Sequence, residues 1–157
     1  MKLHTLILIS VLGIISINTA YAEKRLSERS VSNMLKTMEK SAKSHDAETL
    51  MSFFSKNAKI ILDMPAKLGG KTVMGVSKFT DMLKQSWGMK AEFTYETRDV
   101  VISIAADGKS AIATDLTLET VSIGGKLIMS TKTKEKITIE LIDGKPLIME
   151  LYGKVEI

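Results

Sequence analysis

Residues 126–142, KLIMSTKTKEKITIELI, decide the fold of this chain, because two kinds of side chain alternate along the whole stretch. Successive side chains of a β-strand point to opposite faces of the sheet, so this pattern predicts one long strand. One face is expected to contact the core, and it carries Leu127, Met129, Thr131, Thr133, Glu135, Ile137, Ile139 and Leu141. From residue 130 to residue 140 the other face is polar, which is typical of a solvated sheet surface, and it carries Ser130, Lys132, Lys134, Lys136, Thr138 and Glu140.

Similar alternation on both sides of this stretch predicts three more strands, at about 91–105, 111–123 and 146–156. Three glycine-containing turns separate the four strands: Asp107-Gly108, Gly124-Gly125 and Asp143-Gly144. Glycine accepts the positive φ of tight hairpin turns, so the four strands should form consecutive antiparallel pairs. The alternation shifts by one residue around Arg98-Asp99, which predicts a β-bulge there.

The preceding part of the chain has helical periodicity instead. The spacing of Val31, Met34, Leu35, Met38 and Ala42 predicts a helix from about 26 to 43. Asp46 is expected to cap a short helix over 47–54, and Gly88 to end a third helix over 76–87. Between the second and third helices, the apolar residues 58–64 predict a short strand.

The first 22 residues have the pattern of an export signal. Lys2 precedes the apolar run Leu6–Ile17, and Ala20-Tyr21-Ala22 is a small-x-small cleavage site. The run is shorter than the ~20 apolar residues of a transmembrane helix, so no membrane anchor is expected after cleavage. We therefore expect a signal peptide at 1–22 and one domain at 23–157, exported to a periplasm or secreted.

Composition excludes several classes of site. The 157 residues include 22 Lys and Arg, 18 Asp and Glu, and no Cys, with a net charge of +4. Without cysteine there is no disulfide, no thiolate metal site and no cysteine nucleophile. The positive charge is too small to indicate nucleic acid binding. We expect no metal and no cofactor, because only His45 remains after export and Asp107–Ser110 is typical of a hairpin turn.

These elements predict an α+β fold in which three N-terminal helices pack on one face of a curved antiparallel sheet. Long strands that curl around helices form a cone, so we expect a central pocket.

Two motifs carry a resemblance to a known family. The first is His45–Leu50 continuing through Phe54 to Asn57-Ala58, and the second is Gly75–Phe79 at the start of the third helix. In this order they resemble the nuclear transport factor 2-like superfamily, which includes SnoaL-like and ketosteroid-isomerase-like proteins. The resemblance implies a cone-shaped barrel with an apolar pocket, often dimeric through its sheet. It implies no particular reaction, because this fold hosts enzymes, binding modules and scaffolds.

The resemblance to the isomerase-like members also suggests where catalytic groups would lie. An ungapped match from Asp46 to Ala58 places their base at Leu62 and their first-helix Tyr at Met38. Asp63 follows Leu62, and strand alternation points it to the opposite face unless a one-residue bulge restores it. We therefore expect a pocket that is apolar and short of proton-transfer groups.

Glu135 is the other candidate catalytic residue, because it lies on the face expected to contact the core. Burial in an apolar pocket would raise its pKa and leave it able to donate a proton. The alternative is that Glu135 lies at the sheet edge, either solvated or paired with Arg98 or a nearby lysine.

The expected pocket lining contains several methionines, which adapt to irregular ligand shapes or simply fill a core. The residues expected to bind a ligand are Met38, Leu62, Met82, Trp87, Tyr95, Met129 and Thr133.

Three functions remain open on this basis. The chain is expected to be a non-enzymatic exported module that binds a small apolar molecule. One alternative is an isomerase or dehydratase that uses Glu135 with Asp63 or Asp115. The other is a dimeric accessory subunit that uses the outer face of the sheet.

Overall fold

The computed structural model describes residues 24–157, so the expected signal peptide lies outside the described residues. The helices are α1 (Glu28–Lys43), α2 (Ala47–Met51) and α3 (Val76–Trp87), and Ala66–Leu68 forms one 3₁₀ turn. The strands are β1 (Phe54–Asp63), β2 (Lys71–Gly75), β3 (Glu92–Ile104), β4 (Ser110–Ile123), β5 (Lys126–Ile142) and β6 (Lys145–Glu156). None of the helices in this described part has the length and hydrophobicity needed to cross a bilayer.

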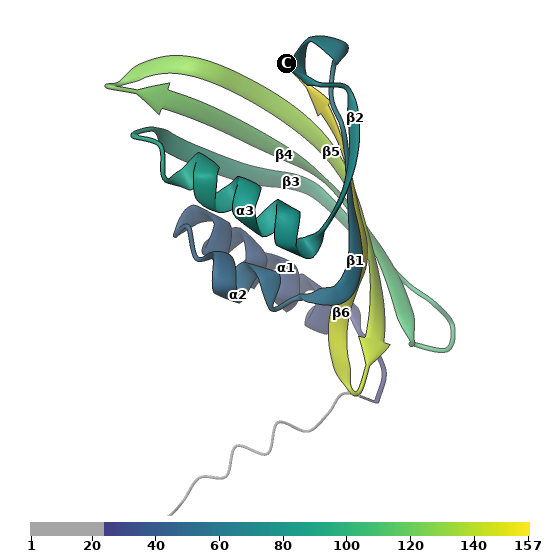
Figure 1. The fold of residues 1–157 in the computed structure, drawn as a ribbon. Coiled ribbons are helices and arrows are strands. Elements are labelled where there is room, and N and C mark those ends of the chain that lie inside the picture. The colour runs from purple at the N-terminus through teal and green to yellow at the C-terminus, as the bar shows by residue number, and fades with distance from the viewer. Residues whose placement is uncertain (1–23) are drawn as a thin grey trace, which may run out of the picture.

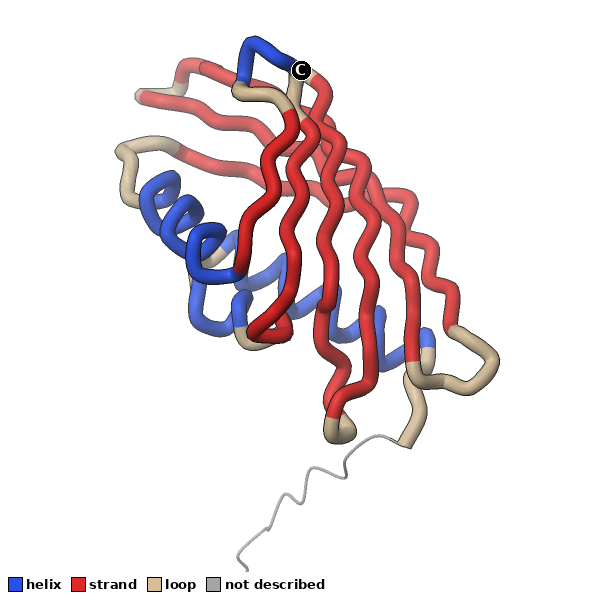
Figure 2. The backbone as a smooth tube through the Cα atoms, turned by 45° about the vertical axis from the view of Figure 1, so that its right-hand side comes forward, coloured by secondary structure: helices blue, strands red, loops and turns tan. Residues whose placement is uncertain are grey.

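The strands form one curved sheet in the order β2-β1-β6-β5-β4-β3. All three helices lie on its concave side, as Figure 1 shows, and the six strands run side by side in Figure 2. The predicted α+β class, the three helices and the hairpins from β3 to β6 are confirmed. The prediction of a wholly antiparallel sheet is wrong, because β1 pairs with β6 in parallel.

Local hydrogen bonds explain where the first two helices begin. Ser27 caps α1: its side chain accepts from the Ser30 amide, and the Ser30 hydroxyl accepts from the Ser27 amide, both at 3.1 Å. Asp46 caps α2 as predicted, since its carboxylate accepts from the Thr49 amide at 3.0 Å. Such caps satisfy amides that have no partner inside the helix.

The predicted boundaries differ from the structure in the segment between α1 and α3. The second helix ends at Met51 instead of residue 54, and β1 begins at Phe54 instead of residue 58. Strand β2 was not predicted, because five residues beside Gly69-Gly70 give too short an alternation to be distinguished from a loop. It pairs with β1 and forms one edge of the sheet.

The solid part of the core lies between α1 and the middle of the sheet. Val31 of α1 is fully buried, as are Ile60, Ile139 and Ile148 on three neighbouring strands. The predicted bulge in β3 is confirmed, since its register with β4 shifts between Arg98 and Val101. Bulges increase the bend of a sheet.

The prediction that Leu127 of β5 faces the core is wrong. Leu127 is 58% exposed, because the register with β4 shifts between Val121 and Ser122. Val121 pairs with Met129, whereas Ser122 pairs with Leu127, so Ile128 is an extra residue that turns Leu127 away from the core.

Candidate functional site

A cavity of about 660 Å³ lies between the helices and the concave face of the sheet. Its helical wall is apolar and includes Leu35, Met38, Leu50, Phe79, Leu83 and Trp87. Strand β1 and the following segment add Leu62, Met64 and Leu68. The helical side chains belong to the faces of the three helices that are turned toward the concave side of the sheet (Figure 1).

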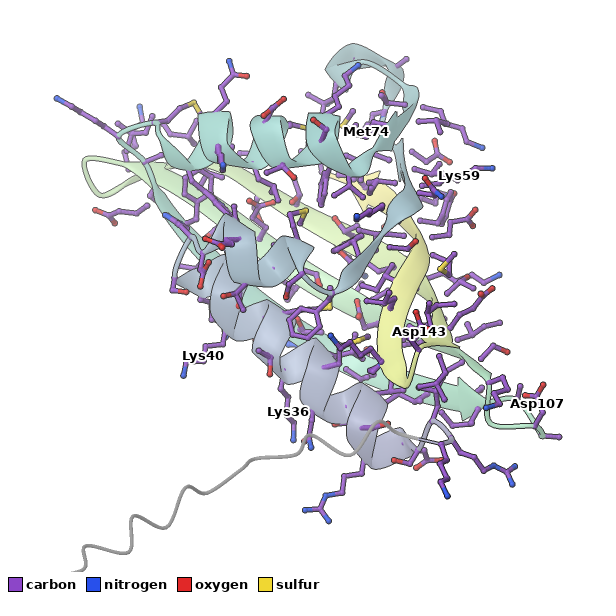
Figure 3. All side chains as sticks on the ribbon, turned by 60° about the horizontal axis from the view of Figure 1, so that its bottom comes forward. Lys36, Lys40, Lys59, Met74, Asp107 and Asp143 are labelled. Carbon is purple, nitrogen blue, oxygen red and sulfur yellow. The ribbon has the colours of Figure 1, made fainter. Side chains whose placement is uncertain are left out.

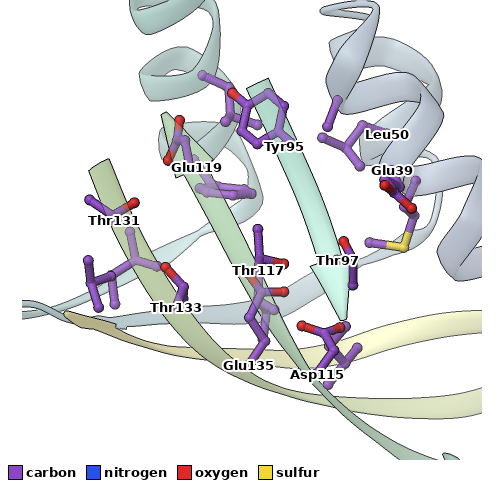
Figure 4. Close-up of a pocket in the computed structure, with 18 of the residues that line it drawn as sticks. Glu39, Leu50, Tyr95, Thr97, Asp115, Thr117, Glu119, Thr131, Thr133 and Glu135 are labelled. Carbon is purple, nitrogen blue, oxygen red and sulfur yellow. The ribbon is translucent and has the colours of Figure 1, made fainter. Parts of the chain in front are cut away.

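The sheet wall of the cavity is polar, and its side chains form rows across the strands. Asp115 of β4 pairs with Glu135 of β5, which pairs with Gly153 of β6. The next row that faces the cavity pairs Thr117 with Thr133. Figure 4 shows these residues on the strands, with Glu39 and Leu50 facing them from the helices. The helical side of the cavity is therefore mainly apolar apart from Lys36 and Glu39, whereas the sheet side carries three acids: Asp115, Glu119 and Glu135.

A glycine lies beside the Asp115–Glu135 row, where the space for a side chain is narrow. A Cβ atom built on Gly153 would lie 3.1 Å from the Thr133 methyl carbon and 3.5 Å from a Leu62 methyl carbon. Gly153 is buried and is directly opposite both Glu135 and Leu62 in the sheet. Any larger residue would narrow the cavity at this row.

Glu135 lines the cavity and is half-buried. Burial raises the pKa of its carboxyl group to about 8, and the nearby charges of Asp115 and Glu119 raise it further. No hydrogen bond opposes this shift. A carboxyl group with such a pKa is mostly protonated at neutral pH and can donate a hydrogen bond.

Asp115 has a lower pKa than its neighbour. Burial raises the pKa of Asp115 to about 6, a hydrogen bond with Thr117 lowers it, and the charge of Glu39 raises it. One carboxyl oxygen, Oδ1, is buried without a hydrogen-bond partner among the described residues. At neutral pH this group is mostly ionised, so a charged and a neutral carboxyl group lie directly opposite each other.

A third acid lies further along β4. Burial raises the pKa of Glu119, while hydrogen bonds with Tyr95 and Thr131 lower it. The Tyr95 hydroxyl also accepts from the Trp87 indole nitrogen at 3.1 Å. Burial raises the pKa of Tyr95 to about 12, so its hydroxyl remains protonated. This chain of contacts joins the end of α3 to β3 and β4.

The structure brings together most of the residues that the sequence singled out. Glu135 and the seven expected ligand-binding residues line the cavity: Met38, Leu62, Met82, Trp87, Tyr95, Met129 and Thr133. Asp63 does not line it, because alternation along β1 turns its side chain to the other face. There its carboxylate accepts a hydrogen bond from the Tyr152 hydroxyl at 3.0 Å.

Two other expectations are wrong. The pocket is not short of proton-transfer groups, since Asp115 and Glu135 meet on its sheet wall. Glu135 does not pair with Arg98, which instead forms a bidentate ion pair with Glu96, with both bonds at 2.8 Å. Glu119 and Gly153 were not singled out, although alternation along β4 and β6 puts them on the same face as other cavity residues.

Positive charge is scarce at the site. Lys36 is the single cationic side chain among the described residues that line the cavity, and it is exposed and projects outward from α1 (Figure 3). Within residues 24–157, no group of three His, Asp or Glu side chains is arranged to hold a metal ion. The buried acids therefore have no cationic partner inside the hollow.

No protein-family model matches the chain, and no curated protein matches it. Solved structures do match its fold. A nuclear transport factor 2-like protein of unknown function from Pseudomonas putida KT2440 has a TM-score of 0.64 at 12% identity, covering 81% of this chain and 84% of that chain.

Two further structures give the same result. A scytalone dehydratase-like protein from Novosphingobium aromaticivorans has a TM-score of 0.64 at 11% identity, covering 82% of this chain and 83% of that one. A nuclear transport factor 2-like protein from Cytophaga hutchinsonii has a TM-score of 0.63 at 11% identity, covering 83% of this chain and 100% of that chain. At such low identity the likeness concerns fold alone. The chain has the nuclear transport factor 2-like fold, as its helix–turn–helix and third-helix motifs indicate.

Proposed function

We propose that this protein binds a small, mainly apolar molecule in the cavity between its helices and its sheet. The observation that carries the proposal is the cavity itself, which has a volume of about 660 Å³ and an apolar helical wall. Ligand pockets usually measure about 300–1,000 Å³ and are lined mostly by hydrophobic side chains with a few polar groups. The acids on the sheet wall would orient the polar end of the ligand.

Binding can be tested with protein isolated from its own compartment. Native mass spectrometry should show a bound small molecule that is released when the protein is denatured. Thr133→Phe should abolish this adduct, because the added ring fills the cavity that Thr133 lines. Thr138→Phe is the matched control, since Thr138 lies on the opposite face of the same strand. An adduct that persists in Thr133→Phe would place the ligand elsewhere, and protein that is empty in every preparation would contradict the proposal.

We also propose that the protein acts outside the cytoplasm, and the apolar run and cleavage site within residues 1–22 support this. Protein recovered from the periplasm or the medium should begin at Glu23. An intact amino terminus on cytoplasmic protein would contradict export.

A second candidate function is acid–base catalysis, which the opposed carboxyl groups of Asp115 and Glu135 favour. Their pKa values of about 6 and about 8 leave one group ionised and the other protonated at neutral pH. Asp115 would take a proton from a carbon of the substrate, and Glu135 would give one to a substrate oxygen. This pairing suits an isomerisation or a dehydration.

Turnover can be distinguished from binding with the molecule recovered from the protein. Incubation in heavy water should introduce deuterium at the carbon that exchanges its proton, and Asp115→Asn should stop the exchange without preventing binding. Binding without exchange at any pH would leave the protein a non-enzymatic module.

A further inference from the structure

The acidic wall of the cavity is unusual because three acids line it and the cavity holds no cation beside the Asp115–Glu135 row among the described residues. Asp115 Oδ1 is buried and has no hydrogen-bond partner in the described part of the chain. Glu135 lies in the same row, is half-buried and lines the hollow, and no hydrogen bond with another described residue contributes to its pKa. Buried polar groups in folded proteins are nearly always paired, so a row of acids that lines a cavity without a cationic partner favours a ligand that brings its own donors.

The lining itself does not supply this donor. Strand alternation turns Lys132, Lys134 and Lys136 to the outer face of the sheet, away from Glu135. Lys134 contacts Glu156 there at 3.4 Å. Glu39, the acid that faces Asp115 from α1, is paired with Lys43 at 2.6 Å. On its cavity side, the Asp115–Glu135 row is therefore left without a cation among the described residues.

A metal ion does not fit this arrangement. Asp115 and Glu119 are four residues apart on one strand, which corresponds to about 13 Å. No metal-holding group of three acids or histidines exists within residues 24–157. Gly153 lies opposite Glu135 and has no side chain, and the space beside it is bounded by a methyl group of Leu62. A donor that enters here must carry an apolar body.

We propose that the ligand of this cavity is an organic amine, bound with its ammonium group against Asp115 and Glu135 and its apolar body against the helices. This inference rests on the proposed binding function and names the class of ligand. An ammonium group has several N–H donors, so it can contact the carboxyl groups of Asp115 and Glu135 together. Charge-assisted hydrogen bonds of this kind are stronger than those of a neutral ligand.

Binding of an amine must depend on pH in a definite direction. The titratable groups that line the cavity are Lys36 and Glu39 from α1, Tyr95 from β3, Asp115 and Glu119 from β4, and Glu135 from β5. A bound cation favours the ionised carboxylates, so its affinity rises as pH increases through their pKa values of about 6 and about 8. Below this range the ligand must also displace protons.

The test compares three probes with one apolar chain: octylammonium, n-octanol and octanoate. Trp87 is the sole tryptophan of the sequence and lines the cavity, so its fluorescence reports binding directly. At about pH 8, octylammonium should bind about tenfold more tightly than n-octanol, and octanoate should bind most weakly. Calorimetry in buffers of different ionisation enthalpy should show proton release with octylammonium and none with n-octanol.

Two variants locate the effect. Asp115→Asn and Glu135→Gln keep the shape of the side chains, and each should reduce the preference for octylammonium over n-octanol severalfold. Glu140→Gln, which removes an acid of β5 that does not line the cavity, should leave the preference unchanged. Circular dichroism confirms that each variant is folded.

The outcomes separate this inference from the proposed function. Equal affinity for octylammonium and n-octanol, or a preference for octanoate, would overturn the amine assignment while supporting an apolar binding site. A preference for octylammonium that survives in Asp115→Asn and Glu135→Gln would also overturn it. Binding of none of the three probes would contradict both proposals.

Discussion

At the scale of single residues, the Asp115–Glu135 pair dominates the site, because it brings two acids together beside an apolar hollow. Burial disfavours a charged carboxylate, and a neighbouring negative charge disfavours it again. Glu135 experiences both effects, so the folded protein binds its proton more tightly than the unfolded chain does. This difference links the stability of the fold to pH.

We predict that Glu135→Gln removes a loss of stability at high pH. The pKa of Glu135 rises from an ordinary 4.5 to about 8 on folding, so the folded form loses stability as pH rises between these values. Glutamine does not titrate, so at about pH 8 the variant should exceed the wild type by about 1–3 kcal/mol in unfolding free energy. Urea unfolding at several pH values measures this.

Glu140→Gln is the control for this prediction and should follow the wild-type curve, since Glu140 lies on the other face of β5 and does not line the cavity. The pKa of Asp115 rises on folding from an ordinary 3.8 to about 6, so Asp115 also lowers the stability of the fold as pH rises between these values, by a smaller amount than Glu135 does. Wild type and Glu135→Gln with parallel stability curves would show that Glu135 ionises normally.

A second prediction concerns Gly153→Ala. The added methyl group would lie 3.1 Å from Thr133 and 3.5 Å from Leu62, so it should narrow the cavity beside Glu135 and weaken n-octanol binding. Gly153 does not have a positive φ, so the fold should survive with stability changed by less than about 1 kcal/mol. Trp87 fluorescence titration and thermal unfolding measure the two effects. Gly75→Ala, whose added atom meets nothing within 4 Å, should bind normally.

The sequence predicts some of these residues and not others. Alternation along 126–142 indicated that Glu135 faces inward, and the same rule correctly separated Leu62 from Asp63. Gly153 was not predicted to matter, because its role depends on which residues of β1 and β5 lie opposite it. Such pairings join distant parts of the chain, and a local pattern carries no information about them.

At the scale of elements, the contact between α3 and β3 forms one side of the cavity. Trp87 ends α3 and donates to the Tyr95 hydroxyl of β3 at 3.1 Å. The ring of Trp87 also stacks on His45, with ring centroids 5.1 Å apart. The hydrogen bond holds the carboxyl end of α3 against the sheet, and the stacking holds it against the turn between α1 and α2.

We predict that Tyr95→Phe loosens this contact. Loss of the hydroxyl leaves the Trp87 nitrogen without its acceptor, which should cost about 1–2 kcal/mol of unfolding free energy and shift the Trp87 emission. Thermal unfolding and fluorescence spectra measure both. Tyr152→Phe is the matched control, because it removes a hydrogen bond of similar length to Asp63 outside the cavity. Its emission spectrum should stay unchanged, and an unchanged spectrum in Tyr95→Phe would contradict the contact.

The elements themselves were predicted best where the pattern is long. Strands β3 to β6 follow from alternation and from glycine turns such as Gly124-Gly125, and α3 follows from helical spacing. The parallel pairing of β1 with β6 could not be predicted, because neither strand contains a signal for a partner so far away in the chain. Strand β2 has only five residues, too few for a pattern.

At the scale of the whole molecule, the outer face of β3 and β4 carries exposed apolar side chains. Val101 is 60% exposed and Ile112 is 42% exposed on neighbouring strands. We predict that two copies pair through this face as a homodimer, since apolar sheet faces are stabilised when they are covered. Light scattering should give twice the mass of one chain, and Ile112→Lys should give a monomer. A monomeric wild type at all concentrations would contradict the prediction.

The central claim is that the hollow between helices and sheet binds a small, mainly apolar molecule, and the methionines offer its most direct test. Met38, Met64, Met82 and Met129 line the cavity, whereas Met34 and Met74 are buried in the core. Methyl NMR spectra recorded while octylammonium is added should show shifts in the four cavity signals and little change in Met34 and Met74. Shifts confined to the exposed Met89, or no shifts at all, would contradict the claim.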